Sequence, residues 1–162
     1  MPDEIVLTDE MRAAVVQPEE WVYEVTTTGV RGFARGVGYT DRTYYDAGAA
    51  AEAGYAALPA PPCYLGTPVY LPGEVDETFS MPVTAAPRPQ WGLTNVLDGG
   101  TETTYRRPLV AGDILTGSHQ ISDLTPKQSK AIGGMLVVTT DSEYRDASGE
   151  VVATQRSQVI FY

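Results

Sequence analysis

The sequence predicts one α+β domain in which an antiparallel sheet covers an apolar helix. At 162 residues, the chain has the size of a single domain and can bury a core without metals or disulfides. Its hydrophobic patterns run in the order strand, helices, long loop and four strands, instead of alternating between strand and helix. The short turn signals between the last strands are typical of an antiparallel meander.

The domain is expected to span residues 21–162, after an N-terminal extension of residues 1–20. Within the extension, the run Glu10–Val16 predicts a short helix. This helix has to stop before Pro18, because a residue that precedes proline avoids the helical conformation. The sequence leaves the role of the extension open.

A strand and an amphipathic helix open the domain. Trp21, Tyr23 and Val25 recur at the two-residue period of a strand that buries one face. Three threonines then lead into a helix whose apolar residues recur at the spacing of one helical face. These residues are Val30, Phe33, Ala34 and Val37. Gly38 is a typical C-terminal cap and is expected to end the helix.

Two further helical segments and a long loop are predicted before the last strands. Asp46 can cap an alanine-rich helix over residues 47–53, with Gly54 as its stop. The prolines at 59, 61 and 62 suit the first turn of a helix, so a helix start is predicted near Cys63. Thr67–Gln90 carries five prolines and almost no periodicity. We expect it to be a loop beside the substrate entrance, because loops this long in compact domains are usually functional or mobile.

Four strands are predicted in the second half of the chain. They cover Gly100–Arg107, Ile114–Asp123, Ile132–Tyr144 and Val151–Phe161. Turn signals at residues 108–113, 125–127 and 146–149 separate them. The pattern therefore predicts that each of these strands pairs with the next one along the chain.

The composition disfavours several classes of partner and site. The formal net charge of -10, from 21 acidic and 11 basic residues, repels phosphodiester backbones and anionic membranes, so neither is an expected partner. Cys63 is the only cysteine and His119 the only histidine, so no internal disulfide and no structural metal site are expected. Since the chain shows neither a secretory leader nor an apolar run of about 18 residues, we expect a reducing cytoplasm.

The segment Gly38–Tyr45, with the sequence GYTDRTYY, carries the strongest functional signal. It resembles the G-D-x-N-P-x-H loop of the MaoC-like (R)-specific enoyl-CoA hydratases and 3-hydroxyacyl dehydratases. Tyr39 stands where the family has its aspartate, and Tyr44 where it has its histidine. Other segments match the family's dehydratase N-terminal, or fatty-acid-synthase-like dehydratase, branch in order and spacing. These are Phe33–Gly38, Ala53–Tyr55, Ala60–Pro62, Asn95–Glu102, Arg107–Asp113 and Glu150–Ser157.

The resemblance covers nearly all of residues 21–161 and implies a hot-dog fold, a sheet wrapped around a central helix. It also implies a pair of hot dogs, either a homodimer or a heteromer, with an acyl tunnel between the units. The implied reaction is the reversible hydration of a trans-2-enoyl thioester to an (R)-3-hydroxyacyl thioester. Acyl-CoA or an acylated acyl carrier protein is the implied substrate, and no cofactor is expected.

Such anionic carriers need a local rim of cations on this acidic chain. The candidates are Arg31, Arg35, Arg42, Arg106 and Arg107. Each of them can equally be a solvated surface arginine.

The loop lacks the family's proton-handling pair. Hydration needs a group that activates water, a group that moves a proton at the α-carbon and a donor to the enolate-like oxygen. Tyr39 and Tyr44 are poor replacements, because a phenol titrates at about pH 10. Asp41 becomes a relocated base, with Tyr44 or Tyr45 beside it, if burial raises its pKa toward neutral. Otherwise it accepts hydrogen bonds from loop amides and fixes the turn.

The predicted helix start offers donors for a thioester carbonyl. Because Pro61 and Pro62 have no N–H, the amides of Cys63 and Tyr64 are the first that remain. As a nucleophile, Cys63 has no histidine near it in sequence, and the alternative is a small buried residue.

His119 and three of the tyrosines can each have a structural role instead of a functional one. His119 is either a catalytic base or a histidine on a sheet face with a structural hydrogen bond. Tyr39, Tyr45 and Tyr64 are expected to contact substrate, although aromatic residues also fill cores and interfaces.

Three functions follow from these alternatives. The first is a catalytically incomplete subunit that binds an acyl thioester and pairs with a catalytic hot dog. The second is a self-sufficient hydratase or dehydratase for an unusual polyketide-like or sterol-type thioester, which uses Asp41 and Tyr44 or Tyr45. The third is a non-catalytic homodimer that binds a small molecule.

Overall fold

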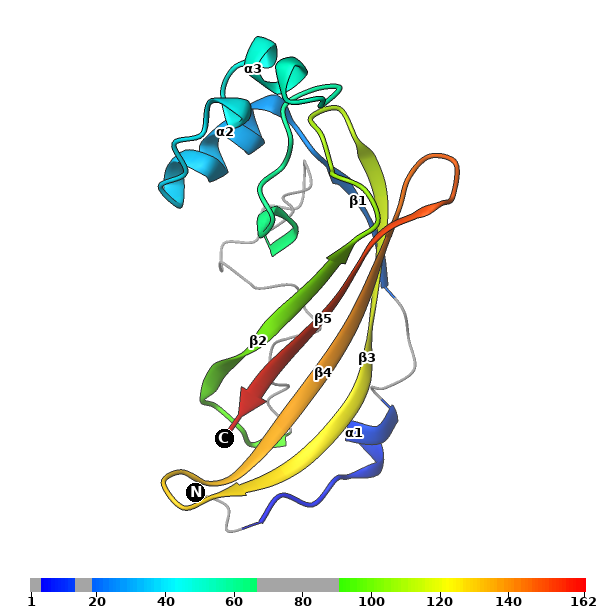
Figure 1. Ribbon diagram of the computed structural model, residues 1–162. Helices are drawn as coiled ribbons and strands as arrows, with labels where there is room; N and C mark the ends of the chain where they lie inside the picture. Colours follow the sequence, from blue (N-terminus) through cyan, green and yellow to red (C-terminus); the bar gives the residue numbers. More distant parts are fainter. Residues whose placement is uncertain (1–3, 14–18, 67–90) are drawn as a thin grey trace, which may run out of the picture.

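The computed structural model describes residues 4–13, 19–66 and 91–162. Their centre is one twisted antiparallel sheet with the strand order β1-β3-β4-β5-β2 (Figure 1). The strands are β1 Glu19–Glu24, β2 Val96–Tyr105, β3 Ile114–Ser129, β4 Gly133–Arg145 and β5 Val151–Phe161. The helices α2 and α3 lie at one end of the sheet and α1 at the other (Figure 1). The chain therefore has the predicted α+β fold.

The helices follow the capping signals of the sequence. They are α1 Asp9–Ala13, α2 Thr27–Gly36 and α3 Ala47–Glu52, with 3₁₀ turns at Arg42–Tyr44 and Tyr64–Gly66. The Thr26 side chain caps α2 by accepting a hydrogen bond from the Gly29 amide at 3.0 Å. Asp46 caps α3 in the same way, through the Ala49 amide at 2.7 Å. Both predicted helices are confirmed.

Near Cys63, where a helix start is predicted, the described residues form a 3₁₀ turn, Tyr64–Gly66. The segment Thr67–Gln90, expected to form a loop beside the substrate entrance, lies outside the described residues. In the described ranges, no helix combines the length and apolar character that crossing a membrane requires.

The predicted order of the last four strands is wrong for β2. This strand pairs with β5 at one edge of the sheet, while β3 lies beyond β4. The link 106–113, which joins β2 to β3, therefore does not form a hairpin. It crosses the end of the sheet past β5 and β4. Its far end bonds to Val25, with Gly112 N donating to the Val25 carbonyl at 2.7 Å. Turn residues alone do not reveal whether a link joins neighbours or crosses a sheet.

The turn predicted at residues 125–127 is also wrong, because β3 continues to Ser129. The strand reverses instead between Ser129 and Gly133, which face each other in the register. Pro126 lies within β3 opposite Leu136. β1 covers β3 only from Ile114 to His119, so in the described residues Pro126 is on an unpaired edge. A proline is tolerated there because no neighbouring strand needs its missing N–H.

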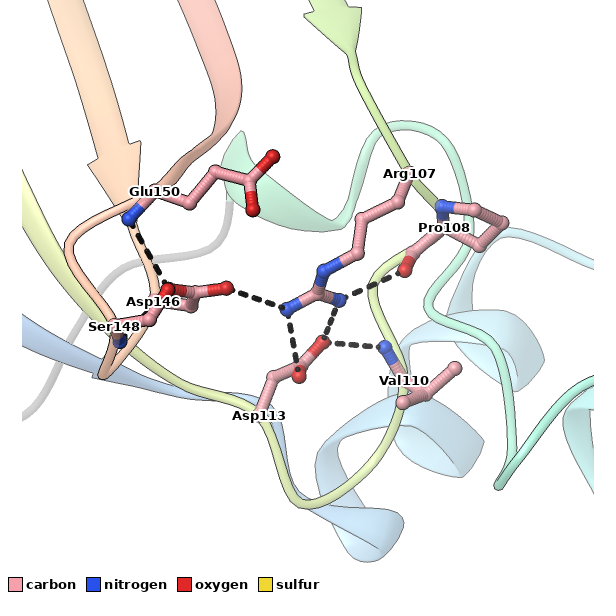
Figure 2. Close-up of polar contacts among 7 residues, drawn as sticks. All are labelled: Arg107, Pro108, Val110, Asp113, Asp146, Ser148 and Glu150. Carbon is pink, nitrogen blue, oxygen red and sulfur yellow. Dashed lines mark hydrogen bonds and ion pairs between the residues drawn. The ribbon is translucent and has the colours of Figure 1, made fainter.

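Arg107 fixes the crossing link (Figure 2). Its guanidinium donates to both carboxylate oxygens of Asp113, at 2.8 and 3.0 Å, and lies 3.9 Å from Asp146 in the β4–β5 hairpin. Asp113 also accepts a hydrogen bond from the Val110 amide at 2.9 Å. Such bidentate, charge-assisted pairs are geometrically specific. The link in turn holds the segment before Cys63, since Ala60 N donates to the Leu109 carbonyl at 2.7 Å.

Two apolar clusters pack on the inner face of the sheet. The cluster at the α2 end contains Tyr23, Val30, Tyr64, Leu115 and Tyr144, and the cluster at the α1 end contains Ile5, Met11, Leu124, Leu136 and Phe161. The strand register places a polar row between them, consisting of Thr103, Gln155, Ser142 and His119. The first cluster lies beneath the segments that carry the predicted site.

Candidate functional site

The tyrosine-rich segment Gly38–Tyr45 forms a closed surface loop directly after α2. Gly38 leaves the helix with a φ of +81°, which residues with a Cβ rarely adopt. The Tyr45 hydroxyl donates to the Tyr39 carbonyl at 2.5 Å and closes the loop. Arg31 of α2 donates to the Tyr45 carbonyl through Nε at 3.0 Å and Nη2 at 2.8 Å. The loop is thus held by itself and by the preceding helix.

Tyr39 and Tyr44, at the two catalytic positions of the related loop, stack on each other. Their ring centroids are 5.6 Å apart with an interplanar angle of 24°. Burial raises the pKa of Tyr44, and the charge of Asp41 raises it further. The Tyr44 phenol is therefore less acidic than a free one and stays protonated at neutral pH. It cannot serve as a ready base.

Asp41 caps the 3₁₀ turn of the loop. One of its oxygens accepts hydrogen bonds from the Thr43 amide and the Thr43 hydroxyl, both at 2.9 Å. These bonds hold the pKa of the exposed Asp41 carboxyl below its ordinary value. The role as a base depended on burial and a raised pKa, and the single chain supplies neither. The geometry matches the alternative in which Asp41 fixes the turn.

The second candidate segment, Pro61–Leu65, is a tight turn beneath α2. Tyr64 N donates to the Pro61 carbonyl at 2.9 Å, so this amide is used within the turn. The Cys63 side chain is exposed, so the alternative in which Cys63 is a small buried residue is wrong. Among the described residues none accepts a hydrogen bond from the Cys63 amide. Of the two predicted donors, the Cys63 amide is therefore the one that the described residues leave open.

The ring of Tyr64, expected to contact substrate, lies in the core with 5% exposure. It packs edge-on against Tyr23 and Phe33, with centroids 6.0 and 5.7 Å away. Its hydroxyl reaches the first turn of α2, where a Cβ added to Gly29 would come within 2.3 Å of it. Tyr64 thus joins the turn to α2, and its buried ring is not placed to contact a substrate.

The two segments contact α2 at different points. The loop follows the C-terminal end of the helix, while the Tyr64 hydroxyl lies against Gly29 near its N-terminal end. In the described residues, no hydrogen bond or ring contact joins Tyr39 or Tyr44 to Cys63. The structure does not bring the two parts of the predicted site into direct contact within one chain.

The arginines proposed as a cationic rim divide into two groups. Arg31 and Arg107 are committed to the Tyr45 carbonyl and to Asp113. Arg42 has 82% of its side chain exposed and lies 4.0 Å from Asp46, a weak surface pair. Arg35 and Arg106 are exposed. Arg35, Arg42 and Arg106 therefore remain available to an anionic ligand.

His119 lies on the sheet, in neither the loop nor the Pro61–Leu65 turn. Its ring centroid is 4.6 Å from that of Trp21 on the neighbouring strand. His119 therefore lies on a face of the sheet. The described residues bring no three His, Cys, Asp or Glu side chains together as a metal site.

Sequence reasoning missed two residues that shape the site, Tyr23 and Tyr105. The Tyr23 hydroxyl donates to the Tyr64 carbonyl at 2.8 Å, and the Tyr105 hydroxyl donates to the Pro62 carbonyl at 2.5 Å. Tyr23 lies 41 residues from Tyr64 in the sequence, and Tyr105 lies 43 residues from Pro62. The strand period places Tyr23 on the buried face, but no local signal pairs either phenol with the turn.

Comparison with known sequences gives a consistent family. Residues 13–155 match the family model described as the FAS1-like dehydratase domain region. A UPF0336 protein of Clavibacter michiganensis is 36% identical over 146 residues, which cover 90% of this chain and 89% of the relative. A probable enoyl-CoA hydratase alpha subunit of Thermomonospora curvata is 29% identical over 150 residues, 89% of this chain but 47% of that longer protein.

Solved structures share the fold. A MaoC-like dehydratase superposes with a TM-score of 0.70 at 24% identity, covering 93% of this chain and 42% of that one. A chain of the ChsH1-ChsH2 complex from Mycobacterium tuberculosis gives a TM-score of 0.71 at 22% identity and covers 94% of this chain and 87% of that one. The chain belongs to the FAS1-like dehydratase family and has the hot-dog fold of the MaoC-like dehydratases.

Proposed function

We propose that this chain is a catalytically incomplete hot-dog subunit that binds an acyl thioester and pairs with a second hot dog carrying the acid and base. The observation that carries the proposal is the loop at the family's catalytic position. There the two tyrosines stack, and Asp41 is exposed with a lowered pKa. The directions of these shifts leave neither Asp41 nor Tyr44 poised to exchange a proton at neutral pH.

The proposed division of labour follows the chemistry of hydration. Water adds its oxygen to C3 of the enoyl thioester and a proton to C2, while negative charge develops on the thioester carbonyl oxygen. The partner would supply the carboxylate and imidazole that move the protons. This chain would contribute the Cys63 amide to the carbonyl oxygen and its surface to the acyl group. Acid–base chemistry of this kind needs no cofactor.

The edge strand β2 supports pairing with a second chain. Among residues 4–13, 19–66 and 91–162 it has a neighbouring strand on one side only, and nearly all its residues are exposed. Val96 and Leu97 at its start are 52% and 45% exposed. An unpaired edge of this length is a ready template for another strand. We propose that the second hot dog adds along β2, as a heteromer or, without a catalytic partner, as a homodimer.

The relatives and the surface charge support the rest of the proposal. One structural neighbour belongs to a complex of two chains, and one relative is named as a subunit of an enoyl-CoA hydratase. The exposed Arg35, Arg42 and Arg106 are candidates to meet the phosphates of coenzyme A or of a carrier protein's prosthetic group. A single cysteine in the sequence fits a reducing cytoplasm.

Co-expression tests the proposal. The chain is produced with a neighbouring gene product that carries an intact G-D-x-N-P-x-H loop, purified through a tag on one subunit and assayed for loss of the enoyl absorbance of crotonyl-CoA. We expect the two chains to co-purify and the complex to turn over. A stable homodimer that ignores this neighbour and binds an acyl thioester without turnover would favour the small-molecule binding protein instead.

A further inference from the structure

The Pro61–Leu65 turn is held from the sheet by two phenols, each on a different peptide group. Tyr105, the last residue of β2, donates to the Pro62 carbonyl at 2.5 Å. Tyr23, on β1, donates to the Tyr64 carbonyl at 2.8 Å. Burial raises the pKa of Tyr105 to about 12, and the nearby Cys63 raises it too, against the effect of a hydrogen bond with the Leu65 backbone. At neutral pH the Tyr105 hydroxyl is therefore a protonated donor.

The bond from Tyr105 acts on the Pro62–Cys63 peptide group, whose N–H has no acceptor among the described residues. The Pro62 carbonyl and the Cys63 N–H belong to the same planar unit, so fixing the oxygen also fixes the direction of the N–H. A hydrogen bond to the carbonyl further polarises the amide and makes its N–H a better donor. Pro61 and Pro62 offer no competing N–H. The Tyr64 N–H is already bonded to the Pro61 carbonyl.

We propose that Tyr105 is a positioning residue that aims and polarises the Cys63 amide toward the carbonyl oxygen of a bound acyl thioester. This inference rests on the proposed function, because it concerns how the same site holds its ligand. Tyr105 does not touch the thioester itself. It acts through the Pro62–Cys63 peptide group.

The chain contains matched control residues for this role. Tyr23→Phe removes a phenol bond to the same turn, but at the peptide between Tyr64 and Leu65. Tyr144→Phe removes a phenol from the same apolar cluster, where Tyr144 packs edge-on against Tyr23 and Trp21. If Tyr105 only stabilised the turn, Tyr105→Phe and Tyr23→Phe would have similar effects on a bound ligand.

The experiment is an infrared difference spectrum of octanoyl-CoA labelled with ¹³C at its carbonyl, bound to the full chain or to its complex. We expect the wild-type protein to lower the carbonyl stretching frequency relative to free octanoyl-CoA. Tyr105→Phe should still bind but lose at least half of this shift. Tyr23→Phe and Tyr144→Phe should retain it. Thermal unfolding and circular dichroism of each variant establish that it is folded.

Each alternative outcome overturns a defined claim. A Tyr105→Phe shift equal to that of the wild type, or an equal loss in Tyr105→Phe and Tyr23→Phe, overturns the positioning role. Octanoyl-CoA bound to the wild type with an unshifted carbonyl overturns this inference and leaves the proposed function standing. Absence of binding to chain and complex overturns both. If Tyr105→Phe does not fold, 3-fluorotyrosine at this position, a stronger donor of similar size, should enlarge the shift, and an unchanged shift overturns the role.

Discussion

The tyrosine-rich loop and the Pro61–Leu65 turn are built in opposite ways. The loop is closed by short-range bonds, from Thr43 to Asp41, from Tyr45 to Tyr39 and from Arg31 to Tyr45. The turn is fixed by phenols of two strands, Tyr23 and Tyr105, both remote in sequence. Replacing residues in the loop therefore alters little of the fold, whereas the turn depends on the whole sheet. Under the proposed function, this difference would allow the loop to lose its proton-handling residues while the turn keeps its structure.

The largest expected effect is the contrast between Tyr64→Ala and Tyr39→Ala. Removing the buried Tyr64 ring leaves a cavity between Tyr23 and Phe33 and should lower the free energy of unfolding by about 3–5 kcal/mol. Tyr39 is 38% exposed and, within the part of the chain that the structure describes, stacks only on Tyr44, so its loss should reduce that free energy by about 1 kcal/mol or less. Urea unfolding of both variants measures the contrast. Similar losses at both sites would contradict the asymmetry between loop and turn.

The second-largest expected effect is the loss of stability when Arg107, which fixes the link 106–113, is replaced. Arg107→Ala leaves Asp113 without its bidentate partner and should lower the free energy of unfolding by about 1–2 kcal/mol, a figure reduced because the Arg107 side chain is 37% exposed. The matched control is Arg156→Ala, which removes an equally bidentate but more exposed pair with Asp141.

Urea unfolding should show a clearly smaller loss for Arg156→Ala than for Arg107→Ala. The difference arises because Arg107 ties the link 106–113 to the β4–β5 hairpin, and this link holds the segment before the Pro61–Leu65 turn. Equal losses for the two variants would mean that the crossing does not stabilise the site end of the sheet.

The smallest expected effect is the loss of stability at low pH. Hydrogen bonds from Ser148 lower the pKa of Asp146, and those from Thr43 lower the pKa of Asp41. A carboxylate with a lowered pKa in the folded state contributes stability above its unfolded value of 3.8, and this contribution disappears as the pH falls through the folded pKa.

Urea midpoints should therefore fall as the pH drops below 3.8 and through the lowered pKa values of these two carboxyl groups. Asp41→Asn should flatten this dependence slightly, because an asparagine side chain carries no titratable group. A steeper fall in Asp41→Asn than in the wild type would contradict the lowered pKa of Asp41.

Local signals in the sequence were sufficient for the elements that are locally determined. Thr26 and Asp46 cap the helices, and Gly38 and Gly54 follow their ends with φ of +81° and +87°. The position of β2 beside β5 could not be predicted in this way, because strand pairing depends on where a link crosses the sheet. The extension of β3 through Pro126 was missed because the tolerance for proline depends on a missing neighbour.

The candidate site shows the same division. The loop could be predicted as a turn that lacks the family's acid and base, and Asp41 as its cap, because both follow from adjacent residues. The burial of the Tyr64 ring and the hydrogen bonds from Tyr23 and Tyr105 could not be predicted. These two hydrogen bonds join residues that are 41 and 43 positions apart in the sequence. The bond from the Tyr64 amide to the Pro61 carbonyl lies within the turn, and it leaves the Cys63 amide as the donor without an acceptor among the described residues.

The rate of crotonyl-CoA hydration by the purified chain without any partner tests the central claim most directly. The account predicts no enoyl absorbance loss above the uncatalysed rate for the chain alone, and turnover when the catalytic hot dog is added. In the complex, Asp41→Asn should leave the rate unchanged. Hydration by the chain alone that disappears in Asp41→Asn would contradict the account and identify a self-sufficient enzyme.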